Sequence, residues 1–418
     1  MKNKIVVTGI GAVTPLGVGV DTYWSNLITG KSGIAPISRF DASALPVQFA
    51  GEVRDFDPLD FMTKKQVKEM ELFMQFGYAS AQEAMTDAGL TEDENGNLPL
   101  PKERIGVVLG NVFAGIIDIA GTQDQFSTGN ASRVNPRFIT RIIGNIAAAQ
   151  IAISKGLKGP SMTVSTACSS GIDAISTGIM LIEQDLADAV ICVGAEAATS
   201  PLTILGLSSI HALSRNNEHP TEASRPFDLN RDGFVMSEGS GTVIIEKETS
   251  ALRRDAKIHC EIKGYANSTD GYHVTRPHPD GIAAVFCMKQ ALKVAGLPLV
   301  AVDYINAHGT STPAGDTIEV NAIKTLFGDH AYKLAVSSTK ASTGHLMGAG
   351  GVTETIACIK AIEEDILPPT INQTTPDPEC DLDFVPNVAR KATVNIAMCN
   401  AFGFGGQNAS LLLTKYAR

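Results

Sequence analysis

Short apolar runs recur along the chain and alternate with longer segments in which apolar residues follow the period of a helix. Residues 5–8, 105–109 and 189–194 are runs of this kind, rich in Val and Ile and without regular polar positions. An unbroken apolar run of this length is typical of a strand that is buried on both faces. Strands alternating with helical segments predict βαβ units, so we expect an α/β protein whose sheets are mostly parallel and covered by helices.

The order of these elements repeats once, which indicates a duplicated architecture. The first copy contains a helix ending at Ala88-Gly89-Leu90 and strands or strand–turn units at 105–109, 164–168, 189–194 and 241–246. The second copy contains a helix ending at Ala295-Gly296-Leu297 and the corresponding units at 302–307, 336–340, 394–399 and 409–414. We therefore predict two similar halves, residues 1–250 and 251–418, that pack through their helices into five layers, α-β-α-β-α.

The composition fits a large globular enzyme. A chain of 418 residues exceeds one ordinary core, and 44% hydrophobic with 19% charged residues is typical of well-packed proteins. No uncharged apolar stretch reaches the roughly 18 residues needed to span a bilayer, and residues 1–4 lead directly into a strand. The formal net charge of −10 argues against nucleic-acid binding. The seven cysteines show no paired spacing, which favours a reducing compartment. Together, these features predict a cytoplasmic protein that binds neither membranes nor nucleic acids.

One cysteine lies where a nucleophile is expected. In Val164-Ser-Thr-Ala-Cys168-Ser-Ser-Gly171, Cys168 follows an apolar run and precedes a helix that is apolar on nearly every face. The N-terminus of a helix carries roughly half a positive charge and unpaired N–H groups, which predicts a thiol that ionises more easily than usual. The other cysteines have the pattern of small core residues: Cys192, Cys260, Cys287, Cys358, Cys380 and Cys399. None forms a CxxC motif or a zinc-type spacing with histidine, so no metal site is predicted.

Two of the eight histidines lie at predicted strand ends comparable to that of Cys168. His308 begins His308-Gly-Thr-Ser-Thr312, and His345 ends Lys340-Ala-Ser-Thr-Gly-His345. Asn400-Ala-Phe402 lies at another such end. Sites in open α/β sheets form beyond the carboxyl ends of strands, so we expect these residues to converge with Cys168. The remaining histidines are interpreted as structural: His211, His219, His259, His273, His278 and His330.

A series of motifs over essentially the whole chain resembles the β-ketoacyl-acyl-carrier-protein synthases, most closely the type II elongating enzymes of bacterial fatty acid synthesis. The matching stretches are Val6-Val-Thr-Gly-Ile-Gly-Ala-Val-Thr-Pro-Leu-Gly17, Ser165-Thr-Ala-Cys-Ser-Ser-Gly171, Ser224-Arg-Pro-Phe-Asp228, Asp232-Gly-Phe-Val235, His308-Gly-Thr-Ser-Thr-Pro-Ala-Gly-Asp316, Ser338-Thr-Lys340, Gly344-His345 and Asn400-Ala-Phe-Gly-Phe-Gly-Gly406. The resemblance implies a thiolase-like fold and a homodimer. It also implies substrates carried on the phosphopantetheine of an acyl carrier protein, with no other cofactor and no metal.

The resemblance assigns a role to each catalytic position. Cys168 would take the growing acyl chain from an acyl carrier protein as a thioester. His308 and His345 would hydrogen-bond the thioester oxygen of malonyl-carrier protein while it loses CO2, and the resulting carbanion would attack the acyl thioester. The backbone N–H groups of Cys168 and Phe402 would form the oxyanion hole for that attack. The product would be a β-ketoacyl chain two carbons longer.

Further positions match supporting residues of the family. Lys340 and Glu354 would form a charged pair that orders the site, and Phe402 would also act as a gate between the malonyl and acyl sites. Thr310 and Thr312 would hold the pantetheine arm, whereas Phe113, Phe138 and Phe404 would contact the substrate. Phe113 stands where related enzymes commonly carry a smaller residue such as Ile, which predicts a shortened acyl pocket, and Phe138 would reach that pocket from the partner subunit.

The family's carrier protein is acidic, so an acidic enzyme needs a local basic patch to bind it. The candidates are Lys64, Lys65 and Lys68 on one amphipathic helix, together with Arg133 and Arg137 after the turn at Gly129.

Two glycine motifs suggest a cofactor but lack the residues that the cofactor needs. Gly9-Ile-Gly11 follows a strand, yet Thr14 replaces the third glycine of a dinucleotide fingerprint and Pro15 follows it. Gly348-Ala-Gly-Gly351 lacks the Gly-Lys-Ser/Thr of a phosphate-binding loop. We therefore predict neither an NAD nor an ATP site.

Three other functions stay open at this point. A ketosynthase of a type II polyketide or aryl-polyene pathway has the same catalytic motifs. A non-enzymatic chain-length-factor subunit is disfavoured by the intact Cys168 and both histidines. A thiolase would need a second catalytic cysteine, and an initiating synthase typically has Asn where this chain has His345. The primer, the chain length and the pathway are not specified by the sequence.

Overall fold

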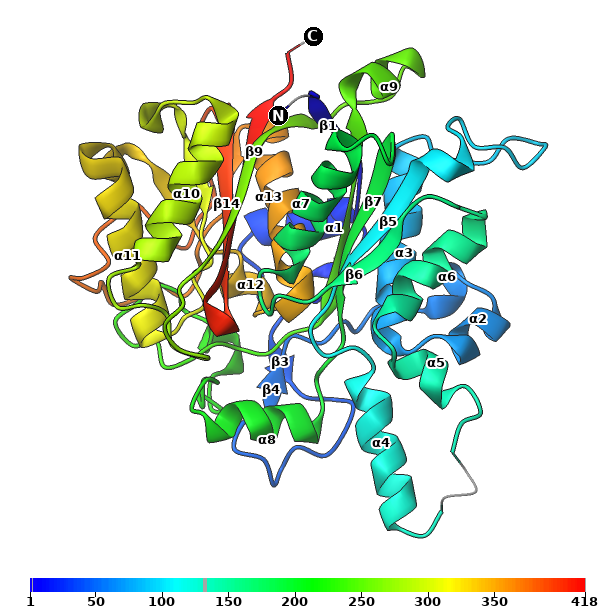
Figure 1. Cartoon of the computed structure of the whole chain (residues 1–418). Helices are drawn as coiled ribbons and strands as arrows, with labels where there is room; N and C mark the ends of the chain where they lie inside the picture. Colours follow the sequence, from blue (N-terminus) through cyan, green and yellow to red (C-terminus); the bar gives the residue numbers. More distant parts are fainter. Residues whose placement is uncertain (2, 131–133, 418) are drawn as a thin grey trace.

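The computed structural model describes residues 1, 3–130 and 134–417, and its elements follow a duplicated order (Figure 1). The main strands of the first half are β1 (Ile5–Thr14), β5 (Ile105–Gly110), β6 (Ser161–Val164), β7 (Ala189–Glu196) and β8 (Gly239–Lys247). Those of the second half are β9 (Cys260–Thr269), β10 (Tyr304–Asn306), β11 (Ala335–Ser337), β14 (Ile396–Gly403) and β15 (Gln407–Lys415). Their spatial orders, β6-β5-β7-β8-β1 and β11-β10-β14-β15-β9, correspond strand for strand, which confirms the predicted fold class.

The sheets are mixed, so the prediction of mostly parallel sheets is wrong. β5 pairs in parallel with β6 and β7, whereas β8 is antiparallel to both β7 and β1. The second half repeats this pattern around β10 and β15. The strands are nonetheless unbroken apolar runs, because such a run reports burial on both faces and carries no information on strand direction. β1 also pairs with β9, so the two halves share one continuous path of strands.

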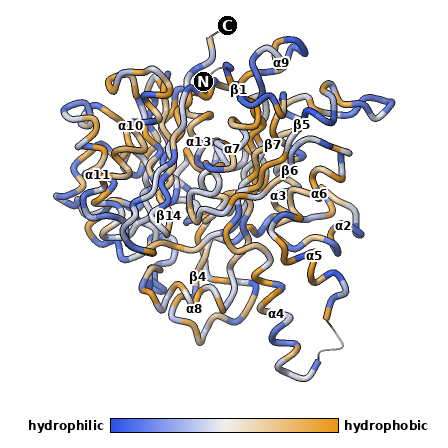
Figure 2. Tube along the Cα trace, in the orientation of Figure 1, coloured by the Kyte–Doolittle hydropathy of each residue, from blue (hydrophilic) through white to orange (hydrophobic). Residues whose placement is uncertain are grey.

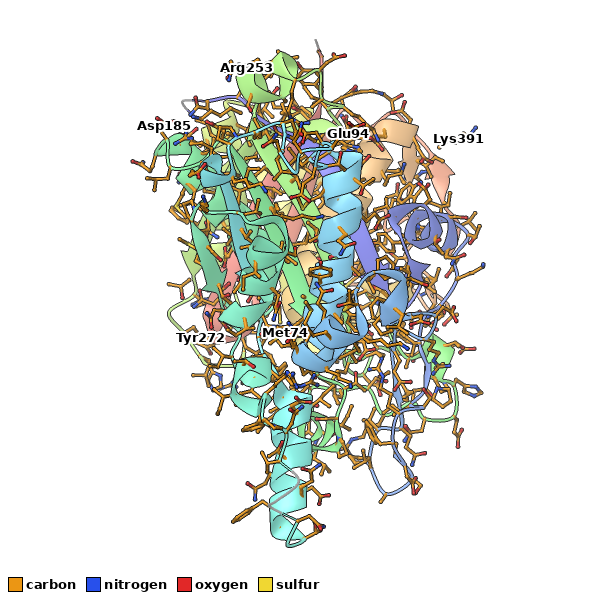
Figure 3. The ribbon with its side chains drawn as sticks, turned by 90° about the vertical axis from the view of Figure 1, so that its right-hand side faces the viewer. Met74, Glu94, Asp185, Arg253, Tyr272 and Lys391 are labelled. Carbon is orange, nitrogen blue, oxygen red and sulfur yellow. The ribbon has the colours of Figure 1, made fainter. Side chains whose placement is uncertain are left out.

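Helices cover both sheets and fill the space between them (Figure 1). On the outer faces lie α3 (Leu72–Asp87) and α6 (Asn145–Lys155) of the first half, and α10 (Ile282–Ala295) and α11 (Pro313–Phe327) of the second. Between the sheets lie α7 (Ser170–Glu183) and α13 (Gly350–Glu364). Figure 3 shows the outer face of the first half, where α3 runs from Met74 upwards and α4 (Ile116–Ser127) projects below it.

The remaining elements are short or peripheral. They are α1 (Val20–Ile28), α2 (Lys64–Glu69), α5 (Phe138–Ile142), α8 (Pro201–Ser209), α9 (Glu248–Arg253), α12 (Lys340–Thr343), β2 (Gly17–Val18), β3 (Ala35–Pro36), β4 (Phe49–Ala50), β12 (Ile366–Leu367) and β13 (Arg390–Lys391). Hydrophobic residues concentrate along β5 and β7, and hydrophilic ones along α9 and the outer loops (Figure 2). Within the described ranges, no helix combines the length and the apolar character needed to cross a membrane.

The two central helices meet at their N-terminal ends through glycine. A Cβ atom added to Gly171 on α7 would lie 2.9 Å from the backbone nitrogen of Val352 on α13. Conversely, a Cβ atom added to Gly351 would lie 2.8 Å from the backbone nitrogen of Ile172. No side chain fits at either distance, so the two glycines allow a backbone contact that brings the start of each helix to the same place.

A buried histidine links the two halves at the far ends of α3 and α13. His259 Nε2 lies 2.6 Å from Asp87 Oδ2 on α3, and His259 Nδ1 lies 2.6 Å from Glu363 Oε1 on α13. Lys257 and Lys360 lie beside the same carboxylates. Burial opposes the charge on His259, yet the two carboxylates outweigh burial and raise its pKa. A histidine that donates from both nitrogens is an imidazolium, so the sequence-based interpretation of His259 as structural agrees with its contacts.

We predict that His259→Gln lowers the free energy of unfolding by about 2 kcal/mol or more at mildly acidic pH, since two charged hydrogen bonds are lost. Because the folded-state pKa is raised, this contribution is complete below the unfolded value of about 6.5 and disappears as the pH rises through the folded value. The contribution to stability also decreases in acid, when the pH falls below the lowered pKa values of Asp87 and Glu363 and these carboxylates become protonated. Thermal unfolding across pH measures this difference.

The matched control is His330→Gln, because the His330 ring bonds only a backbone carbonyl, that of Val302, at 3.0 Å. A stability difference for His259→Gln that grows towards alkaline pH contradicts the assignment of a charged histidine.

Candidate active site

Cys168 lies in the tight turn between β6 and α7. Ala167 has a left-handed φ of 52°, which lets the chain reverse immediately before the cysteine. The Ser170 hydroxyl closes the turn, since it accepts the Thr166 N–H at 2.9 Å and donates to the Ala167 carbonyl at 2.6 Å. The thiol is therefore held at the N-terminal end of a buried helix, as the sequence pattern predicts.

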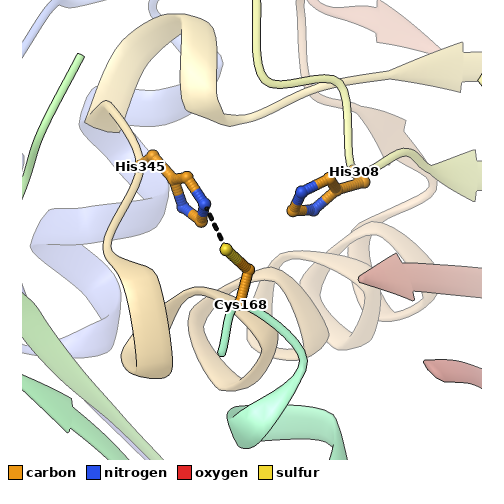
Figure 4. Close-up of side chains that lie close together, drawn as sticks. All are labelled: Cys168, His308 and His345. Atoms are coloured by element: carbon orange, nitrogen blue, oxygen red, sulfur yellow. Dashed lines mark hydrogen bonds between the residues drawn. The ribbon is translucent and has the colours of Figure 1, made fainter. Parts of the chain in front are cut away.

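His345 reaches Cys168 from the second half of the chain. Its backbone N–H donates to the Val235 carbonyl at 2.8 Å, which fixes the segment between α12 and α13. The ring nitrogen Nε2 lies 3.0 Å from Cys168 Sγ (Figure 4). The Met347 N–H donates to the opposite nitrogen, Nδ1, at 3.3 Å. In a neutral ring this places the proton on Nε2, so His345 presents an N–H donor to the sulfur.

His308 completes the cluster after the end of β10. Its backbone N–H and that of Gly309 donate to the buried Glu319 carboxylate at 2.9 and 2.8 Å. The His308 ring lies 5.4 Å from the His345 ring, centroid to centroid, at an interplanar angle of 84°. One side-chain atom from each of Cys168, His308 and His345 lies within 4.8 Å of the other two (Figure 4). The structure thus brings together the three residues that the sequence singles out.

A Cys-His-His set of this size also has the donor atoms that zinc accepts. Ligation would require a lone pair on His345 Nε2, whereas the Met347 N–H keeps the proton on that nitrogen. The hydrogen bonding therefore favours a donor role for His345 over a ligand role. The sequence predicts that these three residues converge, but it shows no metal-ligand spacing, because they lie far apart along the chain.

A buried ion pair between Lys340 and Glu354 sets the electrostatics of the site. Both side chains are almost fully buried and are in direct contact. Burial lowers the pKa of His308 and of His345 well below the usual value of an imidazole, and the positive charge of Lys340 adds to this effect. Both imidazoles are therefore neutral at physiological pH. Neutral rings are suited to donating hydrogen bonds to a developing anion without bringing a second charge into the site.

The resting thiol does not ionise easily, which corrects the expectation from its position at a helix N-terminus. Burial raises the pKa of Cys168 to about 11, although Lys340 and the Phe404 N–H act in the opposite direction. Desolvation of a thiolate in this site thus exceeds the stabilisation from nearby positive groups. The sequence shows the helix terminus but not the desolvation that the folded site imposes on the sulfur, even though Cys168 as a whole is only half-buried at the cavity.

Two backbone N–H groups lie beside the sulfur. Those of Phe404 and of Cys168 itself stabilise a negative charge on it. Phe402, which the resemblance suggests for the oxyanion hole of the acyl carbonyl, lies opposite Asn408 in the ladder of β14 and β15, two residues before Phe404. Its role as an oxyanion donor stays a prediction. The Phe402 ring lies against His308, 6.0 Å between centroids.

A cavity of about 400 Å³ opens onto the three residues. Its lining includes four of the five expected substrate contacts, Phe113, Thr310, Thr312 and Phe404, together with the expected gate residue Phe402. The Thr310 and Thr312 hydroxyls lie 3.0 Å apart at its wall. Phe138, at the start of α5, is half-buried and is not part of this lining among the described residues. Glu319, which sequence reasoning missed, lies eleven positions after His308 on α11 and also reaches the cavity.

The proposed carrier-docking residues lie outside this cavity on α2 and α5. Lys64, Lys65 and Lys68 are exposed on α2. Arg137 lies beside the same helix, with its Nε 3.9 Å from Glu69 Oε1. Arg133 is outside the described residues. The structure thus gathers four of the five basic residues around one short helix.

A thiol that faces two neutral imidazoles and an apolar cavity, at the junction of two duplicated α/β halves, defines a condensing acyltransferase. Sequence profiles of the beta-ketoacyl synthase N-terminal and C-terminal domains match residues 2–251 and 259–374. The chain therefore belongs to the beta-ketoacyl synthase family.

Individual relatives agree with this assignment. The chain is 46% identical to 3-oxoacyl-[acyl-carrier-protein] synthase 2 of Coxiella burnetii, with 99% of each chain covered. It is 47% identical to the protein of the same name from a Synechocystis species, again with 99% of each covered. Among solved structures, a ketosynthase in complex with a type II PKS acyl-carrier protein superposes with a TM-score of 0.91 at 31% identity, covering 99% of this chain and 100% of that one.

We predict that the two partners of the buried ion pair change the reactivity of Cys168 in opposite directions. Lys340 lowers the pKa of Cys168 and Glu354 raises it. Lys340→Met should therefore slow alkylation of Cys168 by iodoacetamide several-fold at pH 8, and Glu354→Gln should accelerate it, since the thiolate fraction changes about tenfold per unit of pKa. Mass spectrometry of the peptide containing Cys168 measures the rates.

Removing one partner of a buried pair also destabilises the fold, so each variant is checked by its unfolding temperature. A change of the same sign in both variants, with both folded, contradicts the electrostatic account.

Proposed function

We propose that the protein holds an acyl chain as a thioester on Cys168 and condenses it with malonyl-acyl-carrier protein by a decarboxylative Claisen reaction in fatty acid elongation. The observation that carries this proposal is the contact of 3.0 Å between Cys168 Sγ and His345 Nε2 in the lining of a largely apolar cavity of about 400 Å³. A nucleophile, two neutral donors and a cavity for an acyl chain are the parts that this reaction needs.

In the first half-reaction, the Cys168 sulfur attacks the carbonyl of an acyl-carrier thioester and the carrier thiol leaves with a proton. The raised pKa of Cys168 means that the thiol must lose its proton as the substrate arrives. The N–H groups of Cys168 and Phe402 would stabilise the negative charge that develops on the carbonyl oxygen, and the Phe404 N–H stabilises negative charge on the sulfur. The chain then remains bound in the cavity beside Phe113.

In the second half-reaction, malonyl-carrier protein loses CO2 and the electron pair of the broken bond passes to the adjacent carbon, as an enolate. His345 Nε2–H and the His308 ring donate to the enolate oxygen. The carbanion attacks the acyl thioester, Cys168 leaves as a thiolate that takes up a proton, and β-ketoacyl-carrier protein is released. Because both rings start neutral, each can donate one N–H without adding a second positive charge beside Lys340.

The name shared by the relatives at 46 and 47% identity favours fatty acid elongation over the alternative, a polyketide or aryl-polyene ketosynthase, since the polyketide neighbour is 31% identical. We place the protein in the cytoplasm, where the acyl carrier protein of this pathway is found. All seven cysteines are free thiols, which fits a reducing compartment.

The acyl carrier protein is the proposed macromolecular partner, and α2 with Arg137 is its proposed docking surface. Three lysines and one arginine around a single glutamate give this surface a positive charge on an acidic protein. An acidic carrier would be attracted to it over about one Debye length, roughly 10 Å.

The protein is proposed to act as a homodimer that forms along β6. This strand ends the sheet path, and its residues Ser161 and Met162 are exposed. Exposed apolar side chains surround it on α5, α6 and α7, namely Ile139, Ile153 and Met180. An unpaired edge strand bordered by apolar residues is unfavourable in a monomer and is covered when a second copy pairs with it. Phe138 on α5 would then contribute to the partner's acyl pocket.

The first test is replacement of the nucleophile. Cys168→Ala should abolish acyl transfer and condensation while the fold stays intact, because a small residue at a helix N-terminus costs little packing. Cys168→Gln should retain decarboxylation of malonyl-carrier protein without condensation. Cys380→Ala, at a buried cysteine outside the site, is the control. An acyl chain extended by Cys168→Ala contradicts the proposed function.

The second test separates the histidines from the cysteine. His308→Ala or His345→Ala should slow decarboxylation of malonyl-carrier protein by roughly a hundredfold or more, because one donor to the enolate is lost. Acylation of Cys168 should be reduced less. Decarboxylation is followed by release of CO2, and acylation by protein mass. Equal loss of both half-reactions in folded variants contradicts this division of roles.

The third test concerns chain length. Phe113 lines the cavity with Cys168, so its ring should limit the length of the acyl chain. Each methylene that remains unburied costs about 0.8 kcal/mol, roughly fourfold in binding, which predicts a steep decrease in rate with chain length. Phe113→Ala should shift the preference towards longer chains in a series of acyl-carrier substrates. Phe126→Ala, on the exposed face of α4, is the control, and an unchanged length profile in Phe113→Ala contradicts the role.

A further inference from the structure

Glu196, the last residue of β7, is a fully buried carboxylate that accepts hydrogen bonds from two different walls of the active site. Oε2 accepts the Val112 N–H at 2.9 Å and the Gly348 N–H at 3.2 Å. Oε1 accepts the Phe113 N–H at 3.1 Å and the Asn111 side-chain amide at 3.2 Å. All four donors are uncharged. Burial raises the pKa of Glu196 to about 7, and the four donors oppose this rise by replacing water around the carboxylate.

The first wall is the loop after β5. The Asn111 side chain holds it by donating to the Ala195 carbonyl at 2.6 Å and accepting the Ala114 N–H at 2.6 Å. Ala114 has a left-handed φ of 48°, so this loop takes one defined shape. It places Val112 and Phe113 in the lining of the cavity. Glu196 therefore anchors the backbone that carries the acyl-pocket wall.

The second wall is the segment between His345 and α13. Gly348 follows Met347, whose N–H bonds His345 Nδ1 and so fixes the proton on Nε2. Met347 has a left-handed φ of 49°, which is costly for a residue with a side chain and needs support from its neighbours. The Gly348 N–H bond to Glu196 supplies such support. A Cβ atom at Gly348 would lie 3.0 Å from Glu196 Oε2, so the two are in tight contact.

We propose that Glu196 is a positioning residue that couples the acyl-pocket wall at Phe113 to the tautomer of His345. A shift of either wall changes the hydrogen bonds that the shared carboxylate offers to the other. The acyl length that the pocket accepts and the rate at which malonyl-carrier protein is decarboxylated therefore depend on one buried group that touches no substrate. This inference rests on the proposed condensation function.

The test is Glu196→Gln, which keeps the size of the side chain but turns one acceptor oxygen into an amide that donates. A backbone N–H group of one wall then faces the N–H group of the Gln amide, so that hydrogen bond is lost. We expect the kcat for decarboxylation of malonyl-carrier protein to decrease roughly tenfold or more, with little change in KM, as His345 loses its fixed tautomer. We also expect a broader length profile for acylation of Cys168, because the Phe113 loop is released.

The control is Glu83→Gln on α3, a half-buried carboxylate that accepts the Ala12 and Val20 N–H groups, each at 2.8 Å, away from the cavity. It should leave the length profile and the ratio of the two half-reactions unchanged. If Glu196→Gln lowers both half-reactions by one factor with the wild-type length profile, Glu196 is merely structural and the inference is overturned.

A second variant keeps the inference testable if Glu196→Gln does not fold. Gly348→Ala, at a position without a positive φ, places a methyl group 3.0 Å from Glu196 Oε2 and 2.9 Å from Asn111 Cα, so it presses on both walls where the carboxylate joins them. It should slow decarboxylation of malonyl-carrier protein and broaden the length profile of acylation together, and a change in one without the other overturns the inference. A wild-type protein that neither acylates Cys168 nor decarboxylates malonyl-carrier protein overturns the proposed function itself. An active wild type with unaffected variants overturns the inference alone.

Discussion

The close contact of α7 and α13 at Gly171 and Gly351 is the constraint on which the active site depends. α7 begins just after Cys168, and α13 begins just after His345, so two residues far apart in sequence become neighbours only if these helix ends touch. A third glycine, Gly194 on β7, allows a similarly close approach of the sheet, because a Cβ atom there would lie 3.0 Å from the Cα of Ala349. Side chains at these positions would separate the halves and, with them, the nucleophile from its donors.

Within that junction, the buried charge of Lys340 acts on all three reacting groups. It lowers the pKa of both histidines and opposes the rise in the pKa of Cys168 that burial causes. The resting site therefore consists of a protonated thiol and two neutral rings, beside one ion pair.

The sequence predicts the duplicated fold and the convergence of Cys168, His308 and His345, because apolar runs and their ends follow directly from local composition. It fails where the outcome depends on packing. Strand direction in β8 and β15 is not encoded in a run that is apolar throughout. The sign of the shift in the pKa of Cys168 depends on how much water the completed fold excludes. The contact of the Phe404 N–H with the sulfur exists only in the folded chain, and Glu196 is recognisable only from its four donors.

The proposed reaction requires Cys168 to carry the acyl chain between the two half-reactions. Mass spectrometry of the wild-type protein mixed with acyl-carrier thioester, followed by peptide mapping, tests it most directly. We expect one acyl group on the peptide containing Cys168, and its disappearance when malonyl-carrier protein is added, with release of a carrier-bound β-ketoacyl chain two carbons longer. Absence of the adduct while the same product forms, or an adduct at Cys168 that malonyl-carrier protein does not consume, would contradict the account.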